Sequence, residues 1–179
     1  MSASILYYTC NTHLPAIDEA CRRQLLKAGL PIISVSLNQS IDFGDVRIVM
    51  DGSRSPEMMH NQILRGLLDV ETDNVFLCES DVLYHPSHFE IEVWDGVIAY
   101  NTNVFKVRYS DGLAVWTDDL QQVSGLQASK DMLLLFYRLR VKQINEQGFN
   151  RHYEPGVKQS IQVGKVETYP STYPNLCIR

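Results

Sequence analysis

The chain has 179 residues, of which 45% are hydrophobic and 21% charged, and its formal net charge is -5. This length and apolar fraction suffice for one domain with its own core, and they exclude a disordered chain. The excess of 21 acidic over 16 basic residues argues against a protein that binds mainly by neutralising nucleic-acid phosphate or anionic lipid.

The first part of the chain alternates strands with helices. Residues 5–9 (ILYYT) form a compact apolar run typical of a strand, and residues 14–28 carry apolar side chains at helical spacing until Gly29. Residues 32–37 (IISVSL) predict a second strand, and residues 47–50 (RIVM) predict a short third one.

A second helix and a buried strand follow. Ser55 is a suitable cap for a helix that has Pro56 at its first position and continues to about Leu68. Residues 75–78 (VFLC) are continuously apolar, which predicts a strand covered on both faces. Such alternation predicts a mostly parallel sheet with right-handed crossovers, and sheets of this kind bind ligands beyond the carboxyl ends of their strands.

After Asp81 the predicted elements are shorter and look antiparallel. They are residues 97–100, 103–109 and 113–116, with a hairpin turn at residues 110–112 (SDG). We expect this half to hold a partner substrate.

The last predicted helix begins after a Ser129 cap and runs to about Asn145, with Gly148 as its stop. The rest, which contains Pro155, Pro170 and Pro174, is expected to be irregular. We find no internal repeat or interdomain linker, so we expect one α/β domain over residues 1–179.

The four cysteines are scattered without a CxxC pair. In a chain with its own core, this pattern favours buried free thiols and a reducing compartment over disulfides. The start of the chain has no basic residues before its short apolar run, and no stretch reaches the roughly 18 to 20 apolar residues of a membrane-spanning helix. We therefore expect a cytoplasmic protein.

The most informative motif is Glu79-Ser80-Asp81, directly after the buried strand. Two carboxylates at the end of a central strand repel each other and lose solvation, so they need a cation, a basic partner or water. A hard divalent ion such as Mg²⁺ or Mn²⁺ meets that need and keeps open positions for phosphate oxygens. A solvated, inert acidic turn is the alternative.

The order of these elements resembles the nucleotide-binding half of GT-A glycosyltransferases. The resemblance is closer to bacterial and phage family 2-like members, in which a segment like residues 76–86 (FLCESDVLYHP) is followed by one like residues 87–89 (SHF). In that superfamily a D-x-D element binds a metal that bridges the diphosphate of a nucleotide sugar. The resemblance implies that Glu79 and Asp81 bind Mn²⁺ or Mg²⁺, with Glu79 in place of the first Asp. It also implies a nucleotide-binding half over residues 1–81 and an acceptor half over residues 82–179.

The resemblance further implies donor contacts around the strand ends. The candidate nucleotide-sugar-binding residues are Thr9, Asn11, Arg54, Gln62, Ser80 and Asp81. Arg54 precedes a helix N-terminus, which itself attracts phosphate. Each candidate in the first strand and its loop also has a structural alternative, since Thr9 can simply end a strand and Asn11 can cap the following helix. For Arg54 the alternative is an exposed loop residue.

Later residues supply the catalytic and acceptor candidates. Residues 124–130 (SGLQASK) resemble the Gly-containing stretch beside the donor sugar, and Glu154 in HYEPG occupies the place of the family's acidic catalytic motif, usually Glu-Asp. Asp118 and Asp119 are the rival candidates for the catalytic base. Trp116 is the candidate for stacking on an acceptor sugar.

The sequence thus predicts a metal-dependent glycosyltransferase with a GT-A-like sheet flanked by helices and a small antiparallel acceptor part. It would move a sugar from a nucleotide-sugar donor to an acceptor hydroxyl, with inversion. The acceptor is a glycan, a lipid-linked sugar or, against the acidic charge, a modified DNA base. One alternative is a nucleotidyltransferase, although no Gly-rich, Lys/Arg-bearing loop follows the first strand. The other is a non-catalytic nucleotide- or glycan-binding module.

Overall fold

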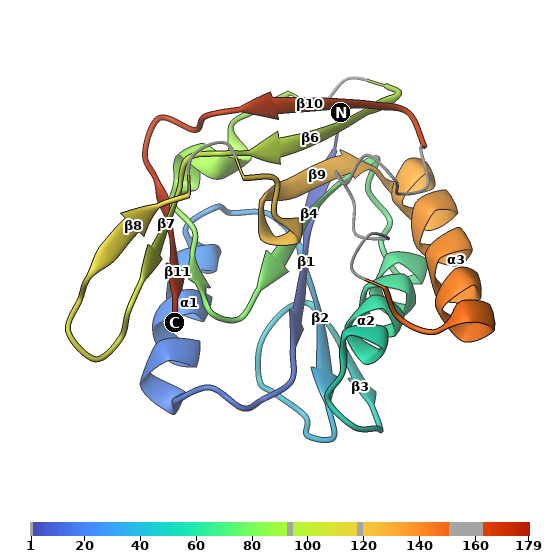
Figure 1. Ribbon diagram of the computed structural model, residues 1–179, viewed down its shortest axis with the longest axis horizontal. Helices are drawn as coiled ribbons and strands as arrows, with labels where there is room; N and C mark the ends of the chain where they lie inside the picture. The colour runs from blue at the N-terminus through green and yellow to red at the C-terminus, as the bar shows by residue number, and fades with distance from the viewer. Residues whose placement is uncertain (1, 93–94, 118–119, 151–162) are drawn as a thin grey trace.

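The computed structural model describes residues 2–92, 95–117, 120–150 and 163–179 (Figure 1). The helices among these residues are α1 (Pro15–Leu26), α2 (Pro56–Leu68) and α3 (Lys130–Gln147), with short 3₁₀ turns η1 (Pro86–Phe89) and η2 (Val123–Gly125). The strands are β1 (Ala3–Thr9), β2 (Ile32–Leu37), β3 (Val46–Met50), β4 (Asn74–Glu79), β5 (Val82–Leu83), β6 (Val97–Asn101), β7 (Val104–Val107), β8 (Ala114–Trp116), β9 (Leu126–Ser129), β10 (Lys165–Tyr169) and β11 (Asn175–Ile178).

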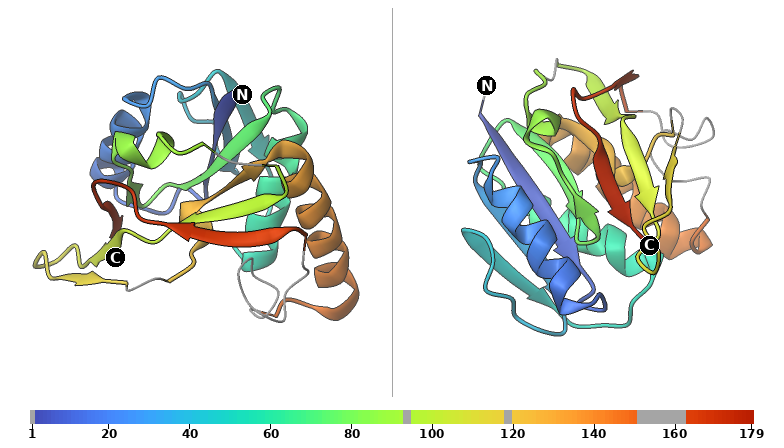
Figure 2. Two further views of the ribbon diagram at one scale, coloured as in Figure 1. Left: turned by 90° about the horizontal axis from the view of Figure 1, so that it is seen from above. Right: turned by 90° about the vertical axis from the view of Figure 1, so that its left-hand side faces the viewer.

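Within the described ranges, seven strands form a central sheet in the order β10-β6-β9-β4-β1-β2-β3. Four neighbouring strands, β4, β1, β2 and β3, are mutually parallel, and β6 and β10 are parallel to each other. Strand β9 lies between β4 and β6 and is antiparallel to both. Helices α2 and α3 cover one face of the sheet, and α1 packs on the other (Figure 2). The predicted α/β class with a mostly parallel sheet flanked by helices is confirmed.

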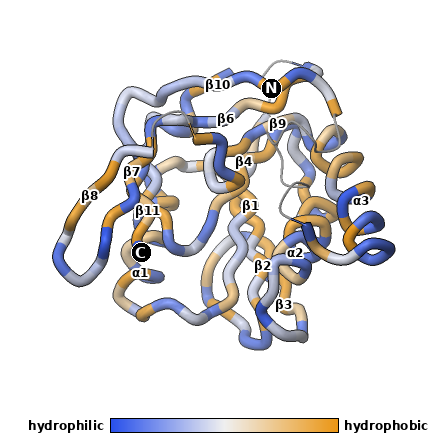
Figure 3. The backbone as a smooth tube through the Cα atoms, viewed as in Figure 1, coloured by the Kyte–Doolittle hydropathy of each residue, from blue (hydrophilic) through white to orange (hydrophobic). Residues whose placement is uncertain are grey.

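Strand β1 lies inside the sheet and is buried on both faces. Leu6 and Tyr8 point into the core beneath α2 and α3, whereas Ile5 and Tyr7 point into the core beneath α1. Helix α2 comes close to β1 because Gly66 has no side chain, and a Cβ there would lie 2.3 Å from Leu6 Cδ1. Figure 3 shows hydrophobic residues along β2 and β4. This packing fixes the strand ends that carry the polar motifs.

A second, smaller sheet has the order β5-β11-β7-β8. Strands β7 and β8 form the predicted hairpin, and Gly112 takes its positive φ of 74° at the turn. Strand β11 pairs parallel to β7 and antiparallel to β5, so this sheet is mixed rather than purely antiparallel. Its place beside the end of β4 brings the last described residues next to the acidic motif.

One expectation about the ends of elements was wrong, and one alternative is not realised. The segment that includes Pro170 and Pro174 was expected to be irregular, but it forms β10 and β11, because each proline lies just outside a strand and breaks no ladder hydrogen bond. Asn11 does not cap α1, whose N-cap is Leu14 without a side-chain hydrogen bond. Gly148 does end α3, with a φ of 79°.

The strands after residue 81 do not all separate from those before it. Strands β6, β9 and β10 extend the same central sheet as β1 to β4, because β9 pairs directly with β4.

In the part of the chain that is described, no helix has the length and apolar character needed to cross a membrane. The four cysteines are free thiols, and only Cys10 is partly exposed.

Candidate functional site

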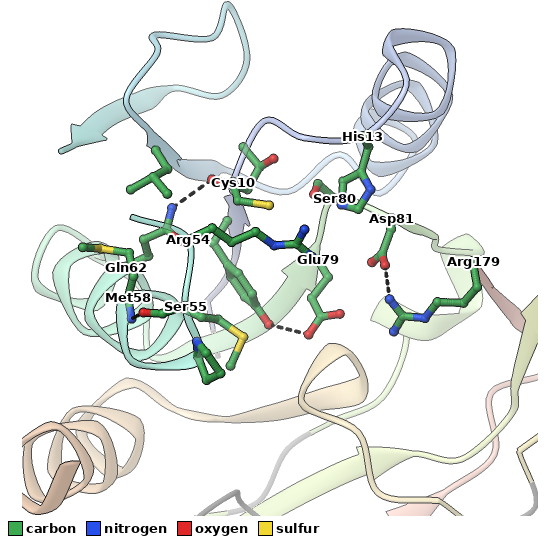
Figure 4. A pocket seen from close by; sticks show the side chains of 15 residues that line it. Cys10, His13, Arg54, Ser55, Met58, Gln62, Glu79, Ser80, Asp81 and Arg179 are labelled. Carbon is green, nitrogen blue, oxygen red and sulfur yellow. Dashed lines mark hydrogen bonds and ion pairs between the residues drawn. The ribbon is translucent and has the colours of Figure 1, made fainter. Parts of the chain in front are cut away.

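A cleft of about 410 Å³ opens at the carboxyl ends of β1, β2 and β4 (Figure 4). This volume is within the usual range for small-ligand sites, and the position is where parallel sheets bind ligands. The described lining residues are Tyr8, Thr9, Cys10, His13, Leu37, Arg54, Ser55, Pro56, Met58, Met59, Gln62, Glu79, Ser80, Asp81 and Arg179.

The acidic motif lies on one wall of this cleft. Glu79 is the last residue of β4, and its Oε1 accepts a hydrogen bond of 3.2 Å from the Tyr8 hydroxyl. Ser80 is buried beside it and also lines the cleft. The Asp81 side chain is only 6% exposed and forms an ion pair with Arg179. Both carboxylates line the cleft (Figure 4).

Buried neutral groups hold the end of β4 in place. The backbone N–H of Glu79 donates a hydrogen bond of 2.9 Å to the Tyr84 hydroxyl oxygen. Burial raises the pKa of the Tyr84 hydroxyl and of the neighbouring Cys78 thiol well above their usual values. The pKa of Tyr8 is raised too, first by burial and then by the charge of Glu79. The motif is therefore presented by a strand whose neighbours stay uncharged.

Arg179 reaches the cleft through β11, and no pattern in the sequence indicated it. The backbone N–H of Ile178 donates to the Asp81 carbonyl at 2.8 Å, and that of Arg179 donates to the Val107 carbonyl at 2.8 Å. Burial alone would lower the pKa of the guanidinium, but the nearby carboxylates, Asp81 foremost, raise it above its usual value. A guanidinium thus lies against the second carboxylate of the motif.

Two asparagines stabilise the loops that follow β1 and β2. Asn11 and Asn38 follow β1 and β2 and have positive φ values of 57° and 59°, a conformation that asparagine tolerates better than most residues. The Asn11 side chain donates to the Leu37 carbonyl at 2.8 Å, and Asn38 exchanges two hydrogen bonds with Gly52. Asn11 is not among the lining residues, so the structure gives it a part in connecting β1 to β2.

Thr9 and Gln62 are both buried and both line the cleft. The Gln62 Nε2 atom donates to the Thr9 carbonyl at 2.9 Å and to the Val35 carbonyl at 3.3 Å. The Thr9 hydroxyl accepts from the Asn11 backbone N–H. Gln62 therefore ties α2 to the ends of two strands, a structural contact that its sequence position did not reveal.

Helix α2 points its N-terminus at the cleft. Pro56 is at the first helical position, and the Ser55 cap accepts a hydrogen bond of 3.0 Å from the Met58 backbone N–H. Arg54 is exposed, and its side chain extends across the cleft towards Glu79 (Figure 4). Within the described residues no ion pair to Arg54 is formed. A helix N-terminus beside an arginine attracts anions.

His13 and Cys10 also line the cleft, although no motif in the sequence indicated them. Both belong to the loop after β1, in which the sequence predicted a binding role for Asn11 alone. His13 points from this loop towards Ser80 and Asp81 (Figure 4). Their position directly after the first strand was the signal that would have found them.

Other candidates are not brought to this cleft. Trp116 is exposed on β8 and is not a lining residue. Residues 124–130, expected beside the donor sugar, form η2, β9 and the start of α3, and none of them lines the cleft. Gly125 instead allows η2 to approach the end of β6 closely, since a Cβ there would lie 2.7 Å from the Asn101 carbonyl oxygen. Glu154, Asp118 and Asp119 lie outside the described residues.

The donor chemistry of the cleft fits a hard divalent cation. Glu79 and Asp81 supply oxygen ligands, and Mg²⁺ is commonly bound by one or two carboxylates together with substrate phosphates. The described residues contain no group of three or more side chains able to hold a metal ion. Two protein ligands with a phosphate-bearing substrate therefore match this site better than a cage made of protein alone.

No protein-family model and no curated protein sequence matches the chain. Solved structures do resemble it. The 2-C-methyl-D-erythritol 4-phosphate cytidylyltransferase from Thermus thermophilus has a TM-score of 0.57 and 10% identity, over 96% of this chain and 89% of that one. The inositol-1-phosphate CTP transferase from T. maritima has a TM-score of 0.50 and 12% identity, over 99% of this chain and 89% of that one.

The glycosyltransferase GlyE from Streptococcus pneumoniae TIGR4 has a TM-score of 0.54 and 10% identity, over 94% of this chain and 45% of that one. This chain thus spans less than half of the length of GlyE. At such identities the likeness shows the fold alone. The chain has the GT-A-like α/β fold that nucleotidyltransferases and glycosyltransferases share.

Proposed function

We propose that the protein is a glycosyltransferase that takes a sugar from a nucleoside-diphosphate donor and passes it to an acceptor hydroxyl. The observation that carries this proposal is the cleft at the strand ends, where the Glu79 and Asp81 carboxylates face an arginine and a helix N-terminus. The fold shared with nucleotide-using transferases supports the same reading.

The residues of the cleft divide the work of donor binding. Arg54 and the N-terminus of α2 attract the diphosphate, while Thr9 and Gln62 form the floor at the strand ends. Glu79 and Asp81 would hold Mn²⁺ or Mg²⁺, which when bound neutralises charge on the leaving diphosphate. The general base that takes the proton from the acceptor hydroxyl is proposed among Glu154, Asp118 and Asp119.

Nucleotidyl transfer is the second candidate function, because three of the similar structures are a cytidylyltransferase, a CTP transferase and a nucleotidyl transferase. The loop after β1, residues 10–14 (CNTHL), contains no Gly, Lys or Arg. Triphosphate binding typically relies on backbone N–H groups of a glycine-rich loop together with a basic side chain. The composition of this loop therefore favours a diphosphate donor.

The test begins with binding. We expect nucleoside diphosphates to bind with Mn²⁺ present and to lose most of their affinity when a chelator is added, as titration calorimetry measures directly. Asp81→Asn should weaken this binding more than Glu79→Gln, since Asp81 matches the family position and Glu79 has the longer arm. Equal affinity with and without chelator would remove the metal from the proposal.

The second stage separates the two reactions. A glycosyltransferase slowly hydrolyses a nucleotide sugar and releases the nucleoside diphosphate, whereas a nucleotidyltransferase combines a nucleoside triphosphate with a sugar phosphate and releases pyrophosphate. We expect wild-type protein to release the nucleoside diphosphate from a nucleotide sugar. Glu154→Gln should lower this release by roughly a hundredfold to ten-thousandfold if Glu154 is the base. Pyrophosphate release without donor hydrolysis would establish nucleotidyl transfer instead.

A further inference from the structure

The formal charges of the described residues that line the cleft balance one another. Its described lining residues include two carboxylates, Glu79 and Asp81, and two guanidinium groups, Arg54 and Arg179, with histidine counted as neutral. A diphosphate brings at least two negative charges into this balanced site. Donor binding therefore needs either an added cation or a redistribution of the existing ones.

The Asp81–Arg179 ion pair is unequal in exposure. The Asp81 side chain is 6% exposed, whereas the Arg179 side chain is 54% exposed. A carboxylate this deeply buried requires a counterion, because an unpaired buried charge is strongly destabilising. The arginine, with its long side chain and half of its surface in solvent, is the partner that can leave.

The backbone of Arg179 keeps the guanidinium in the cleft even when the ion pair opens. Its N–H donates to the Val107 carbonyl at 2.8 Å, and its carbonyl accepts from the Tyr109 N–H at 2.7 Å. The backbone of Arg179 is thus held by the second sheet, and its side chain lies on the wall of the cleft that carries the acidic motif (Figure 4). A guanidinium released there lies within the site and has the planar donors suited to phosphate.

We propose that Arg179 neutralises Asp81 only until a divalent cation binds, and that the displaced guanidinium then binds a phosphate group of the donor. This inference rests on the proposed function, because its second half requires a diphosphate ligand. It makes Arg179 a positioning residue that opposes the ion when the nucleotide is absent and supports the nucleotide when the ion is present. The ion and the nucleotide then bind cooperatively by an exchange of partners within the site.

The test measures two affinities in Arg179→Gln, and the proposal gives them opposite signs. Binding of Mn²⁺ alone is monitored through the loss of the electron paramagnetic resonance signal of the free ion. Mn²⁺ should bind Arg179→Gln more tightly than wild type, because the competing guanidinium is gone. Each of the four common ribonucleoside diphosphates that binds wild type in the presence of Mn²⁺ should bind Arg179→Gln more weakly. Each change should be about fivefold or more, the lower end of the usual range for coupled ligands.

Arg108→Gln is the matched control. Arg108 also pairs with an aspartate, Asp111, but this pair lies in the β7–β8 hairpin and does not line the cleft. The substitution changes the net charge by the same amount and should leave both affinities near wild type. Arg179→Lys keeps a cation without the planar fork, so it should change both affinities in the same directions by less, and it carries the test if Arg179→Gln does not fold.

The outcomes separate this inference from the proposed function. If wild type binds a nucleoside diphosphate with Mn²⁺ but Arg179→Gln binds Mn²⁺ no more tightly, the exchange is overturned and the proposed function stands. Weakening of both affinities would show that Arg179 only supports the fold of the site, and would also overturn the exchange. If wild type binds Mn²⁺ but no nucleoside diphosphate, the proposed function and the phosphate half of this inference both fail.

Discussion

Replacing Gln62 with Met tests how the ends of β1 and β2 are held. Gln62 is buried, and its Nε2 donates to the Thr9 carbonyl at 2.9 Å and the Val35 carbonyl at 3.3 Å. Methionine has similar volume and flexibility, so the substitution removes the donors while creating little cavity. What changes is the hydrogen bonding of two strand ends at the bottom of the cleft.

The size of the effect follows from those two contacts. A buried carbonyl left without its donor costs about 1–3 kcal/mol. The longer bond to Val35 adds less than the shorter one, and the apolar methionine offsets part of the loss. We therefore expect the free energy of unfolding to fall by about 1–3 kcal/mol, which lowers the Tm by about 2–12 °C in a chain of this size.

The assay is equilibrium unfolding in urea, followed by tryptophan fluorescence, with the slope m compared between variants. Asn61→Met is the matched control on the same helix, because the Asn61 amide donates to the Glu57 carbonyl on the exposed side. Its effect should stay within about 0.5 kcal/mol. A Gln62→Met protein as stable as this control would refute the structural role. Loss of nucleotide affinity at unchanged stability would show that Gln62 contacts the ligand directly.

The remaining predictions concern reactivity, pH and packing. A thiol reagent should label Cys10, which lines the cleft, but not the buried Cys78. Treatment with the reagent should block nucleotide binding in wild type and not in Cys10→Ser. Rapid labelling of Cys78 would contradict the assignment of β4 as a buried strand. Burial lowers the pKa of His88 to about 3, so as the pH falls the unfolded chain takes up a proton on this ring before the folded protein does. The contribution of neutral His88 to the free energy of unfolding should therefore be fully present above about pH 6.5. It should be lost as the pH decreases towards 3, by up to about 1.4 kcal/mol per pH unit. His88→Gln should reduce this dependence in urea titrations at several pH values without abolishing it, because burial also lowers the pKa of His60 to about 4. An unchanged slope would show that His88 does not contribute to it. Gly125→Ala should lower the free energy of unfolding by about 1–3 kcal/mol, because its Cβ would lie 2.7 Å from the Asn101 carbonyl oxygen. An unchanged free energy of unfolding would show that the backbone around Asn101 moves to accept the methyl group.

The tautomer of His88 explains why its neutral form is held so firmly. The Asn101 Oδ1 atom accepts from the backbone N–H groups of Asn103 and Ser171, which fixes its Nδ2 as the donor to His88 Nδ1. The proton of the neutral ring is then on Nε2, which has no partner among the described residues. A second proton would have to enter a fully buried ring whose Nδ1 is already an acceptor, so protonation in the folded state is costly.

The sequence by itself was sufficient to place the acidic motif and the first elements around it. The continuous apolar run of residues 75–78 marks a strand buried on both faces, and alternation with helices requires its neighbours to be parallel. Parallel strands put their carboxyl ends at one edge, so Thr9, Arg54 and the Glu79–Asp81 pair had to lie near one another. Local patterning determines each of these first elements, and the right-handed crossovers between them determine how the strands are arranged in the sheet.

Only the tertiary structure decided which cation meets Asp81. Arg179 is 98 residues away from Asp81 in the chain. It directly follows β11, which has only four residues, too few for a hydrophobic pattern that would predict a strand. Strand β11 forms because β5 and β7 offer it ladder hydrogen bonds, which is a property of partners and not of its own sequence. The roles of Asn11 and Gln62 were hidden for the same reason, since their hydrogen bonds join segments 26 and 53 residues apart and leave no trace in local spacing.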